Sequence, residues 1–311
     1  MKYKLFKLNF STALHVGKNK LSDAEVTITA DTLFSALCME AMYDDENGGI
    51  ETLISWARSG KLRLTDALPY YKDTYYIPKP MIQIKREIES DSVTKKNHKK
   101  MKYIPISRIN EYCDGSIDAA AEVDNLKKMG KVEIRTLNTI DVNGIATPYS
   151  LGTFTFEEDW GLYFLLSYED EEILYTVTDY LTAIELSGIG GKRSSGLGKF
   201  TLEQGEFPNE YEGLLRVKGS NSIFVALTTC LPKEDELKVA VKDSHYAIIR
   251  RGGFAYDDTY YDLPKRKKDL YMFKPGSSFT NCFDGDVYDV STEGKHPVYK
   301  YGMPIFLEVS F

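Results

Sequence analysis

The chain has 311 residues, of which 42% are hydrophobic and 27% charged, and its net charge is −7. This is ordinary globular usage, which excludes collagen, long disorder and a small disulfide scaffold, and the length favours two domains. No stretch approaches the roughly 20 apolar residues of a membrane helix. The N-terminus lacks the apolar block of a signal peptide. The four cysteines share no CxxC spacing, so we expect free thiols in a reducing, cytoplasmic setting.

The first third of the chain predicts a strand, two helices and a run of short extended pieces. Residues 2–12 alternate polar and apolar side chains, as a half-buried strand does. Residues 28–43 and 50–58 carry apolar side chains at helical spacing, and Asp31 is the expected N-cap of the first helix. Prolines interrupt the extended pieces that follow over residues 62–80.

The middle of the chain predicts an insertion, then strands and a second amphipathic helix. Residues 85–130 are the least core-like part of this half. We interpret the region near 85–135 as an inserted hairpin or loop that is partly mobile. Strand-like runs follow at 131–142 and 161–168. An acidic run then opens a helix that should end at Gly188, a natural C-cap, before a strand over 197–207.

This order predicts an α+β fold. Without its insertion, the first half alternates strands and helices as a βαββαβ unit does. We expect two tandem ferredoxin-like (RRM-like) domains, residues 1–210 with a glycine-rich loop at 187–199, and residues 211–311 as a degenerate second copy. Residues 206–220 resemble a linker. The RRM signature motif is absent, so stacking of bases on an open sheet face is not expected.

Positive charge is concentrated in a few segments although the chain is acidic. Residues 1–20, 95–108 and 187–200 contain lysine and arginine without any acid, and residues 264–274 hold five bases against one acid. Such segregation can place a basic groove on an acidic body, and the local field steers a polyanion more than net charge does. Solvated loops are the alternative for each run.

The most informative segment is SGIGGKRSSGLGKF, residues 187–200. It matches neither the Walker pattern nor the dinucleotide-binding GxGxxG pattern. It also follows a helix, where the backbone carbonyls create a negative end, so any anion must be held by loop N–H groups, Lys192, Arg193, Ser194 and Ser195. Glycine permits positive φ angles and close backbone approach. A flexible connector is the alternative.

This glycine loop, with the helix before it and the strand after it, resembles the signature loop of the RAMP proteins of CRISPR–Cas systems. Five further segments are similar to the family that forms the fourth subunit of the Csm (type III-A) effector complex: ITADTLFSALCMEA, ALPYYKDTYYIPKP, RRGGFAYDD, YMFKPGSSF and HPVYKYGMPIFLEVSF. The resemblance implies a non-catalytic antiviral-defence protein that binds the 5′ handle of crRNA. It also implies two protein partners, the large polymerase-palm signature subunit and the Csm backbone subunit, and no membrane or cofactor.

The resemblance also assigns residues to the RNA site. From the loop these are Gly188, Gly190, Gly191, Lys192, Arg193, Ser194, Ser195, Gly196 and Gly198. From the turn of the second half they are Arg250, Arg251, Gly252, Gly253 and Phe254. The insertion with Arg108, or the hairpin with Arg135, would correspond to the thumb that separates handle from guide.

The RRGGF turn also supports RNA binding by its own chemistry. Two arginines can clamp phosphates, the glycines admit a strand, and Phe254 can stack on a base. A basic turn beside a core phenylalanine is the alternative.

His15 supports a second hypothesis, because a histidine can act as the base of a metal-independent, crRNA-processing endoribonuclease. A hydrogen-bonding or structural role for His15 is the alternative that we favour. Asp257, Asp258 and Asp262, and the run of Asp284, Asp286 and Asp289, lack the pattern of a calcium loop and are expected to be solvated turns without metal.

Overall fold

The computed structural model of the protein describes residues 1–17, 20–44, 48–84, 92–140, 144–215, 222–255, 265–292 and 296–309. Its helices are α1 (Ala30–Ala41), α2 (Gly49–Arg58), α3 (Ser92–Lys100), α4 (Ile109–Asp114), α5 (Ala119–Lys127), α6 (Glu171–Ser187), α7 (Asn209–Glu212) and α8 (Glu234–Ala240). The described residues also form two 3-10 turns, η1 (Ile106–Arg108) and η2 (Arg193–Ser195). Among the described residues, no helix has both the length and the apolar character to cross a bilayer.

The strands of the first half are β1 (Lys2–Phe10), β2 (Leu62–Leu64), β3 (Leu68–Tyr71), β4 (Thr74–Pro78), β5 (Tyr103–Pro105), β6 (Gly130–Ile140), β7 (Ala146–Phe156), β8 (Trp160–Tyr168) and β9 (Phe200–Gly205). Those of the second half are β10 (Ile223–Ala226), β11 (Ile248–Arg251), β12 (Phe254–Ala255), β13 (Lys265–Arg266), β14 (Leu270–Phe273), β15 (Ser278–Phe279), β16 (Val287–Asp289), β17 (Tyr299–Tyr301) and β18 (Phe306–Val309). The expected helices at 28–43 and 50–58, and the helix ending at Gly188, are all present.

The central sheet has the strand order β5-β4-β3-β8-β1-β9, with β2 also paired to β8, and its ladders are antiparallel. Alternation in β1 places Phe6 and Leu8 against one core and Leu5 against another. Strand β8 lies in the middle and is buried along its whole length, which explains its unbroken apolar run. The fold is therefore mixed α/β with antiparallel sheets, as the sequence predicted.

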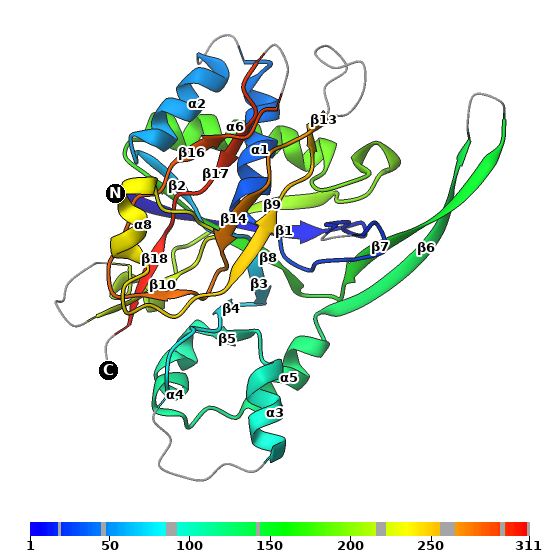
Figure 1. The fold of residues 1–311 in the computed structure, drawn as a ribbon. Coiled ribbons are helices and arrows are strands. Elements are labelled where there is room, and N and C mark those ends of the chain that lie inside the picture. Colours follow the sequence, from blue (N-terminus) through cyan, green and yellow to red (C-terminus); the bar gives the residue numbers. More distant parts are fainter. Residues whose placement is uncertain are drawn as a thin grey trace.

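The two faces of this sheet are covered by different parts of the chain. Helices α1, α2 and α6 pack on the face that carries Phe6 and Phe164. The opposite face, which carries Leu5 and Leu165, packs against the C-terminal half and against a helical lobe. This second face is covered by protein, so it offers no open platform for bases. Figure 1 shows the helices above the sheet and the lobe of α3, α4 and α5 below it.

The C-terminal half contributes a three-stranded sheet, β15-β10-β18, and short two-stranded ladders. It shares both cores with the first half. Val225 and Leu307 join the cluster beneath the central sheet, whereas Tyr301 and Met303 join the helical cluster. The backbone N–H of Leu64 donates a hydrogen bond of 2.9 Å to the Tyr301 hydroxyl. Long-range packing therefore fixes the two halves against each other.

Two expectations for the connecting segments require correction, and one strand was missed. In the described part of the insertion, residues 92–129 form α3, α4 and α5, with Ile104 and Ile109 buried, so this lobe is core-forming. Sequence reasoning missed strand β7. It pairs with β6 to form one long hairpin that projects from the body (Figure 1). In the expected linker, Tyr211 is fully buried and hydrogen-bonded to Tyr163, while residues 216–221 lie outside the described residues.

The expected N-cap role of Asp31 is also wrong. The cap position is Thr29, whose side chain makes no capping hydrogen bond. Instead, Asp66 Oδ1 accepts a hydrogen bond of 2.9 Å from the Ala30 N–H at the start of α1. A carboxylate from a distant loop thereby satisfies a donor that the helix leaves free, and Asp31 is available for another role.

Candidate nucleic-acid interface

A cleft of about 420 Å³ brings together three segments that sequence analysis singled out separately. The glycine-rich loop, the RRGGF turn and His15 all line it, together with α1 and β17. Four cations and one carboxylate are among its lining residues: Arg193, Arg251, Lys267, Lys300 and Asp31. The cleft is therefore positively charged although the whole chain is negative, which is the arrangement that attracts an anionic ligand.

The glycine loop is shaped by close packing against the segment that follows β1. The Gly191 N–H donates to the His15 carbonyl and the Gly198 N–H to the Ala13 carbonyl, both at 2.9 Å. A Cβ at Gly190 would lie 2.6 Å from the His15 carbonyl oxygen, and one at Gly198 would lie 1.9 Å from the Ile189 carbonyl oxygen. These glycines let two backbones meet, so their contribution to a site is the shape of the loop.

Three polar side chains of the loop, those of Lys192, Ser194 and Ser195, are exposed and do not line the cleft. Lys192 adopts a left-handed φ of 62° and places its Nζ 5.1 Å from the centre of the Tyr149 ring on β7. The loop thereby contacts the projecting hairpin. Ser194 and Ser195 are exposed. Arg193 reaches back to the Gly188 carbonyl at 3.5 Å and lines the cleft.

His15 is buried and its ring is oriented by the protein. Its Nδ1 lies 2.6 Å from the Gly152 carbonyl oxygen on β7. Because a carbonyl can only accept, Nδ1 carries the proton, and a neutral ring then has its lone pair on Nε2. A Cβ added at Gly191 would lie 2.7 Å from His15 Cδ2, so the loop packs directly on the ring. His15 therefore ties the loop to the hairpin.

The RRGGF turn separates into a structural arginine and an exposed pair. Arg251 makes a bidentate ion pair with Asp31 and also donates to the Thr29 and Thr32 hydroxyls. Arg250 is half exposed and lies 3.8 Å from Asp269 Oδ2. Phe254 is 66% exposed, so it is not a core phenylalanine. A Cβ at Gly252 would lie 2.0 Å from Asp269 Oδ1, so a larger residue there would displace the Asp269 side chain.

Asp31 is the centre of a buried charge network in the floor of the cleft. Its carboxylate also accepts a hydrogen bond of 3.2 Å from Lys300 Nζ, and both side chains are buried. Burial by itself would raise the pKa of Asp31, but the charges of Arg251 and Lys300 outweigh it and lower the pKa to about 2. The carboxylate therefore stays ionised.

Sequence reasoning missed two cations of this cleft, Lys267 and Lys300. Burial, together with the nearby charge of Lys300, lowers the pKa of Lys267. Lys267 belongs to the basic run at 264–274, which was the available signal, whereas Lys300 stands in a tyrosine-rich strand and gave none. Only the fold brings these two side chains to α1.

The other sequence-predicted candidates lie elsewhere. Arg108 is paired with Glu111 and Glu122 within the helical lobe. Arg135 is half exposed on the projecting strand β6. Asp257, Asp258 and Asp262 fall outside the described residues.

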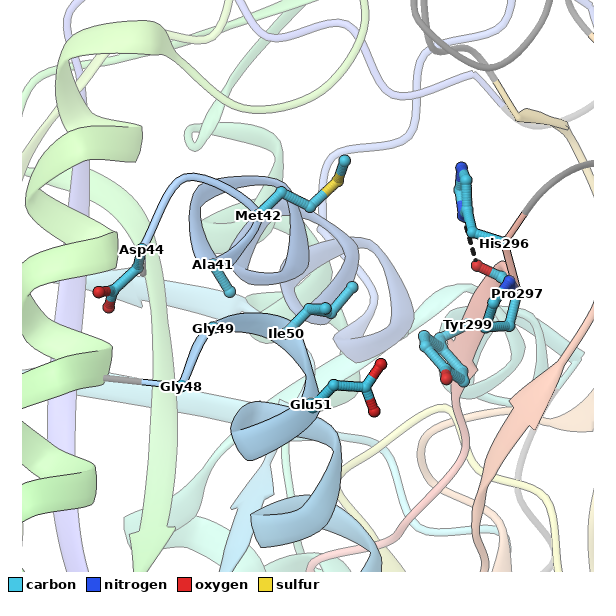
Figure 2. Close-up of a pocket in the computed structure, with 10 residues that line it drawn as sticks. All are labelled: Ala41, Met42, Asp44, Gly48, Gly49, Ile50, Glu51, His296, Pro297 and Tyr299. Atoms are coloured by element: carbon cyan, nitrogen blue, oxygen red, sulfur yellow. Dashed lines mark hydrogen bonds between the residues drawn. The ribbon is translucent and has the colours of Figure 1, made fainter. Parts of the chain in front are cut away.

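A second cavity of 460 Å³ provides a contrast (Figure 2). It lies between the end of α1, the start of α2 and the segment around Pro297. Asp44 and Glu51 line it, and its described lining contains no lysine or arginine. A cavity with this charge would repel a phosphate, so the cleft with the glycine loop is the better candidate for RNA.

Comparisons with known proteins agree with this architecture. Residues 220–309 match a family model described as the CRISPR Csm4 C-terminal domain. The chain is 37% identical over 309 residues to the CRISPR system Cms protein Csm4 of Mycobacterium tuberculosis (strain ATCC 25618 / H37Rv), covering 99% of this chain and 98% of that relative.

Two solved structures share the fold. One is a chain of the Csm3–Csm4 subcomplex in the type III-A CRISPR-Cas interference complex, with a TM-score of 0.69, 20% identity and 99% coverage of both chains. The other is a chain of a Csm1–Csm4 cassette in complex with cA4, with a TM-score of 0.61, 18% identity and coverage of 99% of this chain and 98% of that one. From the extent and level of sequence identity to its relative, this chain belongs to the Csm4 family of CRISPR–Cas proteins.

Proposed function

We propose that this protein is a non-catalytic RNA-binding subunit of a type III-A CRISPR effector complex and that it binds the 5′ handle of crRNA in the cleft described above. The supporting observation is that the glycine loop, the RRGGF turn and His15 line one positively charged cleft. These segments are far apart in sequence, and a set of unrelated connectors would have no reason to meet there.

The side chains suggest a division of labour between the cleft and its margin. Arg193, which lines the cleft, would contact a phosphate there. The exposed side chains of Lys192, Ser194, Ser195 and Arg250 would contact phosphates of the same strand beside the cleft. Phe254, which is exposed, would stack on an unpaired base. Arg251 and Lys300 are held by Asp31, so they would contribute to the field and to the shape of the floor. Lys267 adds a partly buried charge.

The architecture also supports the finer fold proposal. In the first half, strands β9, β1, β8 and β3 lie in that order, and α1 and α6 pack on the same face. This is the arrangement of one ferredoxin-like unit, and we propose residues 1–210 as that domain and 211–311 as a degenerate second copy. The projecting β6–β7 hairpin, which carries Arg135, is the better candidate for the thumb between handle and guide.

Bridging of two protein neighbours is part of the same proposal. The solved structures that share this fold contain Csm4 with Csm3 and Csm4 with Csm1. We propose that this chain likewise joins a backbone subunit to the large signature subunit. The endoribonuclease alternative is less well supported. The sequence identity places the chain in the Csm4 family, and the His15 ring is hydrogen-bonded to Gly152 and ties the loop to the hairpin.

Titration of RNA with a defined handle tests the site. The full chain with Lys192→Ala and Arg193→Ala should bind handle RNA more weakly, and the slope of log affinity against log salt should fall by about one to two. The matched control is Lys238→Ala with Lys242→Ala, two exposed lysines near α8 and outside the cleft lining. Unchanged affinity and slope in the loop variant would remove this loop from the RNA site.

Incubation of the full chain with repeat RNA in the absence of metal tests the alternative. The proposal expects no cleavage. Cleavage that His15→Ala abolishes would make the protein a nuclease.

A further inference from the structure

Helix α3 carries a concentration of positive charge that the cleft does not use. It lies in the lobe with α5, on the side of the central sheet opposite to α1 and α6 (Figure 1). Four lysines are on the helix and a fifth follows it: Lys95, Lys96, Lys99, Lys100 and Lys102. All five are exposed, and residues 92–102 contain no acid.

The rest of the helix explains why the lysines point outward. Met101, next to its end, is buried, and Asn97 and His98 are partly buried, so this side packs on the lobe. Lys79 Nζ donates a hydrogen bond of 2.7 Å to the His98 carbonyl and fixes the last turn. No ion pair between described residues involves any of the five lysines. Their charges are thus not neutralised by the described part of the chain.

The chemistry of this face favours a nucleic acid over a protein. Lysine is depleted in protein–protein interfaces, and such interfaces depend on buried aromatic and arginine anchors. The exposed face of α3 offers one apolar side chain, Val93, and no aromatic residue. An ammonium group is a point charge that contacts phosphate without the planar geometry that reads base edges.

The length of the helix fits a short stretch of strand. Nine residues of α-helix extend about 14 Å. A stacked strand rises roughly 3.4 Å per nucleotide along its axis, so about four nucleotides could lie along α3. We propose that the lysine face of α3 is a second RNA-binding site, separate from the cleft, which holds the sugar–phosphate backbone of a single strand irrespective of its sequence.

Binding of an oligouridylate RNA, which contains no handle sequence, tests this site on the full chain. Lys95→Gln with Lys99→Gln should lower the affinity several-fold and reduce the salt slope by about 1.4, because each phosphate contact on a single strand contributes about 0.7. The control, Lys238→Gln with Lys242→Gln, has the same spacing and should leave affinity and slope unchanged. Glutamine preserves the helix and removes only charge.

Replacing all five lysines with glutamine should reduce the salt slope by about 2.8, the value for about four phosphate contacts, while handle binding in the cleft persists. An unchanged slope for oligouridylate in this variant overturns the α3 site and leaves the cleft proposal standing. Loss of a protein partner from the assembled complex, with oligouridylate binding intact, also overturns it. The reverse pattern, in which Lys192→Ala with Arg193→Ala affects handle RNA alone, supports two separate sites.

Discussion

The Asp31 carboxylate accepts hydrogen bonds of 3.0 and 3.1 Å from the Arg251 guanidinium, across 220 positions of the chain. Asp31 is in the first turn of α1, and Arg251 is the last residue of β11 and the second residue of the RRGGF turn. This pair fixes the RRGGF turn over the helix, so that Phe254 and the glycine loop border the same cleft. The geometry of the proposed RNA site therefore depends on a buried ion pair as well as on its exposed cations.

Replacing Asp31 with asparagine should destabilise the fold strongly. It would leave Arg251 and Lys300 without their counter-charge in a buried setting, which costs about 3–5 kcal/mol. Chemical denaturation measures the loss. The control is Asp284→Asn, which breaks the 2.6 Å pair with Arg63 at a site where the aspartate is 66% exposed, and it should cost under about 1 kcal/mol. Equal losses would show that burial does not set the strength of the Asp31 pair.

Asp31 should also confer a stability that acid removes. Its pKa is about 2 in the folded protein, below the ordinary 3.8, so the unfolded chain binds the proton first. The contribution is complete above about pH 4 and disappears as the pH falls toward 2, amounting to roughly 2 kcal/mol. Unfolding free energies measured over this range should converge for the wild type and Asp31→Asn. Parallel curves would contradict the assignment.

Asp66 should have the opposite pH dependence. Burial raises its pKa to about 6, although hydrogen bonds from Thr229 and the Ala30 N–H partly offset this. Because the folded carboxyl holds its proton more tightly, its contribution is complete below about pH 4 and is lost as the pH rises through 6, by roughly 3 kcal/mol. Asp66→Asn retains an acceptor and cannot ionise. Relative to the wild type it should gain stability between pH 4 and 7, and a constant difference would refute this.

Two glycines of the loop should differ sharply when changed to alanine. Gly196 has a φ of 81° and open space where the methyl group of an alanine would lie, so Gly196→Ala should cost about 1–2 kcal/mol from backbone strain alone. Gly198 has a φ of 72° and the additional clash with the Ile189 carbonyl, so Gly198→Ala should cost clearly more. Thermal unfolding compares the two. Handle affinity should fall in the Gly198 variant, because the loop must move, and a variant that binds normally would separate loop shape from RNA binding.

The sequence determined those features that depend on near neighbours. Helical spacing and a terminal glycine predicted α6 and the start of the loop at Gly188, because capping and periodicity act within a few residues. Composition identified the loop, the RRGGF turn and His15, and the structure places all three in one cleft. The apolar run at 161–168 likewise indicated a strand, which the structure shows as β8.

Only the tertiary structure decided which distant groups meet. Asp31 looked like a helix cap, because its local position suits one, but Arg251 and Lys300 arrive from the far end of the chain and take its carboxylate. Asp66 then caps α1 from a separate loop. Strand β7 and the buried Tyr211 were missed for the same reason, since their stability comes from long-range pairing and packing that no local pattern encodes. Short-range propensity depends on residues that are close in sequence. The balance of buried charges is set only when the chain folds and brings distant residues together.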